Sequence, residues 1–169
     1  MPKPSPTSYA VYFQRYIDLV PETDLVAAFK NQTAGVEDFL NTITEEKSAY
    51  AYAEGKWSIK ELLQHVIDAE RIFNYRALCF ARGEKANLPG FEEDDYAANS
   101  NANSRSWKSL TEEFIAVRKS TVLLFESFSE KVIHNAGLSN NNPNTVASLG
   151  FITVGHYYHH KKILQERYL

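Results

Sequence analysis

The stretch Trp57-Ser58-Ile59-Lys60-Glu61-Leu62-Leu63-Gln64-His65 marks the start of a long helix. Ser58 and Glu61 have the spacing of a capping box, in which each side chain accepts a hydrogen bond from a free backbone N–H of the first turn. Apolar residues then recur at helical spacing to about Arg82 and form a stripe broad enough to be largely buried. His65 lies on this apolar face, so we expect its side chain to point into the core.

Three further segments carry the same 3.6-residue periodicity. They run from about 24 to 42 after a cap at Thr23 or Asp24, from a cap at Ser104 or Ser106 to about Phe128, and from a cap at Thr145 to the terminus. Together with the helix from Ser58 they predict an all-α fold, a four-helix bundle in which a long connection, residues 83–104, joins the second and third helices.

The segments outside these helices read as irregular structure. Residues 1–22, which hold three prolines near the start, are expected to lie as an N-terminal strap across the bundle. The connection 83–104 reads as one loop, and loops of this length are often functional. The Asn-rich run from Ala136 to Asn144 is polar enough to be an exposed loop, and no alternating pattern is strong enough to predict a sheet.

The composition narrows the class of protein. The 169 residues fit a single domain, 1–169. Because 18 Lys and Arg face 21 Asp and Glu, the formal net charge is -3, and no global basic field attracts nucleic acid. Cys79 is the only cysteine, which suits a reducing compartment. No segment reaches the roughly 18 apolar residues of a membrane helix, so we expect a soluble cytoplasmic protein with neither a nucleic-acid nor a membrane partner.

The stretch Gly155-His156-Tyr157-Tyr158-His159-His160 carries the most specific chemistry. On a helix, side chains four residues apart lie about 5–6 Å from each other at Cβ, so His156 and His160 can bind one divalent ion. Neighbouring apolar residues place both rings on the buried side, where an unpaired imidazole costs free energy. His159, three residues after His156, is the competing second ligand, and histidines that are merely packed in the core are the structural alternative.

His65 is the best candidate for a third ligand, because it also faces the core. Three inward histidines with one open position match catalytic zinc sites, in which the ion lowers the pKa of a bound water or thiol. Three imidazoles suit several divalent metals, so the spacing alone does not name the ion.

Other polar residues have simpler structural roles. Cys79 is expected to be a small buried hydrophobe. Glu61, Asp68 and Glu70 are most simply solvated or capping, although Glu70, Arg71 and Arg76 could instead line the mouth of a pocket. The acidic run from Glu92 to Asp95 reads as a solvated loop in which a carboxylate could still act as a base.

Three stretches together resemble the DinB-like (DinB/YfiT) superfamily of metal-dependent enzymes: Lys56 to Arg71, Leu88-Pro89-Gly90-Phe91, and Gly155 to His160. The resemblance runs over nearly the whole chain. It implies a four-helix bundle, often a homodimer, and a divalent metal bound by His65, His156 and His160. It thereby selects His160 over His159. Several members of the family transfer low-molecular-weight thiols such as bacillithiol or mycothiol, and others are called hydrolases.

These observations lead to one main hypothesis and two alternatives. The main hypothesis is an enzyme whose zinc or nickel activates a low-molecular-weight thiol for S-transfer to a small electrophilic substrate. The loop 83–104 would shape the pocket, with Asp94, Asp95 and Tyr96 as candidates for substrate contacts. A metal-dependent hydrolase that uses bound water is the first alternative, and a non-catalytic metal- or ligand-binding bundle linked to stress is the second.

Overall fold

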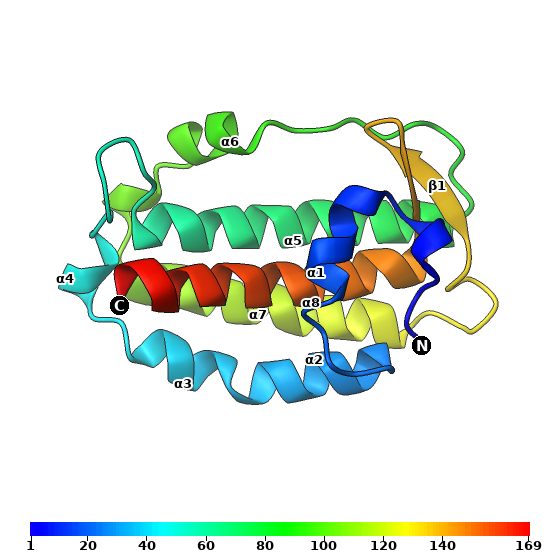
Figure 1. Cartoon of the computed structure of the whole chain (residues 1–169), viewed down its shortest axis with the longest axis horizontal. Coiled ribbons are helices and arrows are strands. Elements are labelled where there is room, and N and C mark those ends of the chain that lie inside the picture. The colour runs from blue at the N-terminus through cyan, green and yellow to red at the C-terminus, as the bar shows by residue number, and fades with distance from the viewer.

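The computed structural model describes residues 1–169. Four long helical segments lie side by side, which confirms the all-α four-helix bundle (Figure 1). They are α2 (Leu25–Ala34) continued by α3 (Val36–Asn41), α5 (Ile59–Ala81), α7 (Trp107–Glu126) and α8 (Val146–Ile163), and α8 ends in a π-helical turn, Leu164–Tyr168. No helix is long and apolar enough to cross a membrane.

The caps predicted from the sequence fix the starts of these helices. The Ser58 hydroxyl accepts from the Glu61 N–H at 3.1 Å while the Ser58 N–H donates to the Glu61 carboxylate at 2.7 Å, so the capping box at α5 is confirmed. Asp24, Ser106 and Thr145 cap α2, α7 and α8. The first predicted helix is interrupted at Gly35, which separates α2 from α3.

A buried ion pair crosses the middle of the bundle. The Arg118 guanidinium on α7 donates two hydrogen bonds of 2.8 Å to the Glu70 carboxylate on α5, and both side chains are almost fully buried. The Thr121 hydroxyl donates to the same carboxylate, and Arg118 also donates to Gln32 of α2. Gln32 in turn donates to the carbonyl of Val154 on α8 at 2.8 Å. The prediction that Glu70 is solvated or capping is therefore wrong, because this carboxylate is buried in a hydrogen-bond network that connects all four helical segments.

The connection between the second and third long helices is not a single loop. It contains α6 (Glu93–Asn99) and a 3-10 turn (Ala102–Ser104), and α6 packs beside α5. Of the acidic residues predicted to lie in a solvated loop, Glu92 is the N-cap of α6, and Glu93, Asp94 and Asp95 occupy its first turn. Carboxylates are favourable there because the N-terminal end of a helix carries a partial positive charge.

The Asn-rich run folds as a hairpin, contrary to the expected exposed loop. Strands β1 (Ala136–Ser139) and β2 (Asn142–Thr145) pair antiparallel, and Asn140 and Asn141 between them have φ values of 49° and 60°. Asparagine tolerates this left-handed conformation, and a two-residue turn of this kind suits the twist of a hairpin. Because Ser139 and Asn144 are buried in the hairpin, polarity did not predict exposure here.

The N-terminal segment lies across α8 (Figure 1). It consists of two 3-10 turns, Pro6–Ser8 and Val11–Phe13, followed directly by the single turn α1 (Gln14–Ile17). Another single turn, α4 (Glu45–Ser48), precedes α5. The contact between α1 and α8 falls at Gly155, next to the first histidine of the last helix.

Candidate metal centre

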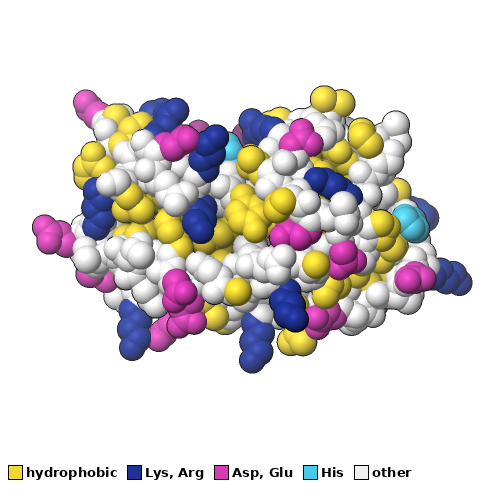
Figure 2. Space-filling view, turned by 60° about the horizontal axis from the view of Figure 1, so that its bottom comes forward, with side chains coloured by type: hydrophobic (Ala, Val, Ile, Leu, Met, Phe, Trp, Pro, Cys, Tyr) yellow, Lys and Arg dark blue, Asp and Glu magenta, His cyan; other side chains and the backbone are white.

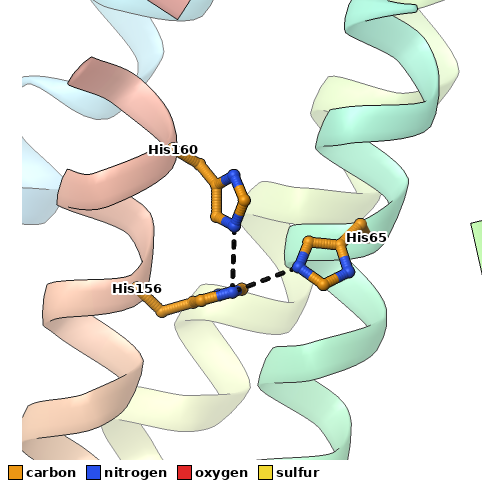
Figure 3. Close-up of side chains that lie close together, drawn as sticks. All are labelled: His65, His156 and His160. Carbon is orange, nitrogen blue, oxygen red and sulfur yellow. Dashed lines mark hydrogen bonds between the residues drawn. The ribbon is translucent and has the colours of Figure 1, made fainter. Parts of the chain in front are cut away.

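The structure brings His65, His156 and His160 together from two helices. His65 projects from α5, and His156 and His160 project from successive turns of α8 (Figure 3). The Nε2 atom of His156 lies 3.1 Å from Nε2 of His65 and 3.0 Å from Nε2 of His160. The ligand atoms of the three residues all lie within 4.8 Å of one another, so the predicted trio converges on one point.

Hydrogen bonding alone does not satisfy this arrangement. In a neutral imidazole, Nε2 carries either one proton or one lone pair, so Nε2 of His156 makes one well-directed hydrogen bond and not two. In a tetrahedral site with metal–nitrogen distances of about 2.0–2.1 Å, the ligand nitrogens lie about 3.3 Å apart. The two separations measured from His156 Nε2, 3.1 and 3.0 Å, are close to this value, and all the ligand atoms lie within 4.8 Å of one another, so the three side chains fit a shared divalent cation.

Burial keeps these imidazoles neutral. Loss of solvent is the main reason that the pKa of His65 falls from 6.5 to about 4, even though the nearby charge of Asp94 acts in the opposite direction. Burial also lowers the pKa of His156 and of His160 well below the ordinary value, and the neighbouring imidazoles lower both further. Neutral rings present the lone pairs that a metal ion requires.

Aromatic side chains surround the histidines. The Tyr16 ring of α1 and the Phe73 ring of α5 meet the His156 ring edge-on, with centroids 5.3 and 5.8 Å away. The Trp57 ring lies 4.9 Å from that of His65. The His160 Nδ1 atom is buried without a hydrogen-bond partner.

A cavity of about 510 Å³ opens beside the three histidines. In the space-filling view a histidine is visible at the base of a notch in the surface, with Lys or Arg side chains on both sides (Figure 2). Other residues that line the cavity are Tyr12, Phe13, Arg15, Tyr16, Trp57, Ala69, Phe73, Arg76, Gly90, Phe91, Glu92, Glu93, Ser139, Asn140, Asn142 and His159. The site therefore lies in the wall of a pocket with both apolar and charged lining.

The three predicted substrate contacts lie apart from this lining. Asp94, Asp95 and Tyr96 are exposed residues of α6, next to the cavity-lining Glu92 and Glu93. Tyr96 does not line the cavity, but its ring packs against that of the lining residue Phe91, with centroids 5.1 Å apart. Asp94 influences the centre only through its charge near His65.

Several residues of the site were not assigned to it from the sequence. Arg15 and Tyr16 come from the N-terminal segment, and no local pattern indicates that this segment contacts the histidines. His159, the competing second ligand, is half-buried in the cavity wall and is not part of the trio. Cys79, predicted to be buried, is only partly so and lies outside the cavity.

The fold and the trio define a helical bundle with a three-histidine centre open to a pocket. The chain belongs to the DinB superfamily, because the model of that family matches residues 28–164.

Two proteins that resemble this chain carry names that mention a metal. A solved structure described as "YfiT from Bacillus subtilis is a probable metal-dependent hydrolase with an unusual four-helix bundle topology" matches with a TM-score of 0.74 over 84% of this chain and 82% of that chain. The sequence identity is 12%, so this likeness shows the fold alone. A protein of Oceanobacillus iheyensis named "Putative metal-dependent hydrolase OB0413" is 25% identical over 64 residues, 38% of this chain and 37% of that protein. The chain thus spans little more than a third of that relative's length.

Proposed function

We propose that this chain is a metal-dependent enzyme in which His65, His156 and His160 hold a zinc or nickel ion and activate a low-molecular-weight thiol for transfer to a small electrophile. The observation that carries the proposal is the convergence of three neutral Nε2 atoms in the wall of a cavity. Three protein ligands beside a pocket leave room for a further ligand, as in catalytic zinc sites.

The bound ion would supply the charge that lowers the pKa of a thiol or water at the open position. The protein contributes the environment. Burial of the imidazoles holds them neutral, and the rings of Tyr16, Trp57 and Phe73 limit the access of water to the centre. A site shielded in this way strengthens electrostatic interactions between the ion and its ligand. The resemblance to the DinB-like superfamily, in which several members transfer low-molecular-weight thiols, supports a thiol as the nucleophile.

Hydrolysis is the second candidate function, and one observation favours it. Glu92 and Glu93 line the cavity that contains the histidines, so a carboxylate is available as a general base for water. The names of both relatives agree with this chemistry. The two candidates share the same metal centre and differ in the molecule that enters it.

The metal content of purified protein tests the shared part of the proposal. We expect about one zinc or nickel ion per chain in the wild type. The metal content of the variant His156→Ala should be much lower. A stoichiometry that His156→Ala leaves unchanged would refute the centre.

Turnover of an electrophile such as 1-chloro-2,4-dinitrobenzene, with and without added thiols, then separates the two reactions. Thiol-dependent product supports transfer. Hydrolysis of esters or amides without thiol supports the second candidate, and metal binding with neither activity supports a non-catalytic bundle.

A further inference from the structure

Arg76 is a buried cation without an anionic partner. The side chain is only 6% exposed, yet it makes no ion pair, and its one hydrogen bond is from Nη2 to the Pro89 carbonyl at 2.7 Å. The other buried arginine, Arg118, is fully paired with Glu70. Because a buried charge is costly unless it is paired, the exception at Arg76 calls for a counterion from outside the chain.

The position of Arg76 connects it to the histidine centre. Both Arg76 and His65 line the same cavity and lie on one face of α5, about three turns and about 16 Å apart along the helix axis. Ala69 and Phe73 lie between them on the same cavity wall. Long helical side chains lean toward the helix N-terminus, and His65 lies on that side of Arg76.

The end of the cavity around Arg76 is polar. Arg76 is bonded to the Pro89-Gly90 turn, and a Cβ at Gly90 would come within 2.8 Å of the Asn140 side chain in the hairpin turn. Asn140 and Asn142 both line the cavity at this end and offer amide N–H groups. The apolar residues Ala69 and Phe73 therefore separate the histidine end of the cavity from an end with a guanidinium and amides.

The carboxylates nearby do not neutralise this guanidinium. Glu92 and Glu93 line the cavity but are exposed at the start of α6, and neither forms an ion pair with Arg76. Arg15, on the α1 side, is likewise without a carboxylate partner and lies over the Tyr12 ring at 4.0 Å. Two unpaired guanidinium groups on one cavity favour an anionic ligand.

We infer that Arg76 binds an oxyanion, a carboxylate or phosphate group, at the far end of an elongated ligand whose reactive end lies at the three histidines. The planar guanidinium matches two oxygens of either group. The apolar stretch formed by Ala69 and Phe73 contacts the apolar middle of the ligand. The inference rests on the proposed function for the reactive end only, since the oxyanion contact itself needs no metal.

Matched thiol probes test this inference on the zinc-loaded and the metal-free protein. The probes are 8-mercaptooctanoate, 8-mercaptooctyl phosphate and the neutral 8-mercaptooctanol, and their dissociation constants are measured by isothermal titration calorimetry. The variants are Arg76→Gln, Arg76→Lys and, as a control, Arg82→Gln, which removes an exposed charge from the end of the same helix outside the cavity.

The inference predicts a preference for an anionic probe over the neutral probe of about tenfold or more in the wild type. Arg76→Gln should abolish this preference without weakening the binding of the neutral probe. Arg76→Lys should retain part of the preference, and Arg82→Gln should retain all of it. Whichever anionic probe binds more tightly identifies the oxyanion.

Equal affinities for anionic and neutral probes, or a preference that survives Arg76→Gln, would overturn the inference. If Arg76→Gln weakens all probes equally, its role is structural and the inference also fails. Failure of the proposed function has a different signature. In that case zinc would not improve the binding of any thiol, while a charge preference that depends on Arg76 would persist in the metal-free protein.

Discussion

Gly155 of α8 lies directly against the backbone carbonyl of Tyr16 in α1, where a Cβ at position 155 would come within 2.0 Å of the Tyr16 oxygen. Only glycine permits this approach without a shift of the backbone. The contact also places the Tyr16 ring edge-on against His156, the residue that follows Gly155. The glycine of the Gly-His pair thus positions the N-terminal segment over the metal centre.

Replacement of Gly155 by alanine should therefore displace α1. We expect Gly155→Ala to lower the free energy of unfolding by about 1–3 kcal/mol, because the clash is with backbone and not with the end of a flexible side chain. Urea denaturation followed by circular dichroism measures the loss, and faster tryptic cleavage after Arg15 would report the displaced segment.

Gly35→Ala is the matched control for this experiment. Nothing lies within 4 Å of a Cβ at Gly35, and its φ of -112° is accessible to alanine. The free energy of unfolding of the Gly35→Ala variant should stay unchanged or rise slightly. Equal behaviour of the two variants would show that the contact between α1 and α8 is not tight in solution.

The two adjacent histidines of α8 should differ in their effect on metal binding. His160 contributes its Nε2 atom to the cluster, whereas His159 is half-buried beside the Tyr16 ring, with centroids 5.3 Å apart. We expect His160→Ala to weaken the binding of zinc or nickel by at least about tenfold, and His159→Ala to weaken it far less. Competition with a chelating dye measures both affinities, and a larger loss in His159→Ala would reassign the ligand.

The sequence was sufficient for the bundle but not for the contacts between distant segments. Periodicity and caps such as Ser58 with Glu61 are local, so the helices and their starts followed from the residues. Helical spacing left both His159 and His160 as possible partners of His156, and the resemblance to the DinB-like superfamily selected His160. The sequence did not predict the hairpin at Asn140, because polar composition alone indicates a loop. The turn depends on two asparagines in the left-handed conformation, which the composition does not reveal.

Long-range pairing explains the remaining differences. Glu70 was taken for a solvated or capping residue, because its partner Arg118 is 48 positions away and no local pattern connects the two. The sequence also does not predict that Arg76 lacks an ion-pair partner, because only the fold shows that no carboxylate reaches this side chain. The place of Tyr16 against His156 depends on the path of an irregular segment.

Disruption of the buried pair of Glu70 and Arg118 should lower the free energy of unfolding more than disruption of a surface pair. Glu70→Gln leaves the buried guanidinium without its charge partner, and we expect a loss of about 3–5 kcal/mol. The double variant Glu70→Leu with Arg118→Met should lose less than the single one, because no charge remains unpaired. Denaturant titrations of the wild type and of both variants give the free energies of unfolding.

The exposed pair of Lys162 and Glu166, 3.7 Å apart on the last helix, supplies the control. Glu166→Gln should change stability little or not at all, since exposed pairs are screened by solvent. A loss in Glu70→Gln no larger than that in Glu166→Gln would mean that the central pair is hydrated in solution.

The metal-free protein should become less stable in acid because of its buried imidazoles. The pKa of His65 is about 4 in the fold against an ordinary value of 6.5, and the pKa values of His156 and His160 are lowered in the same direction. Between these values the unfolded chain binds more protons than the folded chain, so the free energy of unfolding decreases as the pH falls from about 6.5 toward 4. Above this window the three rings are neutral in both states and contribute no pH dependence.

His65 alone should account for a decrease on the order of 3 kcal/mol across the window. Denaturant titrations of the metal-free protein at pH 7.5, 6, 5 and 4.5 measure the slope, with His65→Gln as the matched variant. The slope should be shallower in His65→Gln, because one of the three groups no longer takes up a proton on unfolding. If both proteins lose stability in parallel over this range, the imidazole of His65 is hydrated and protonates in the folded state, and the buried neutral centre described above does not persist without metal.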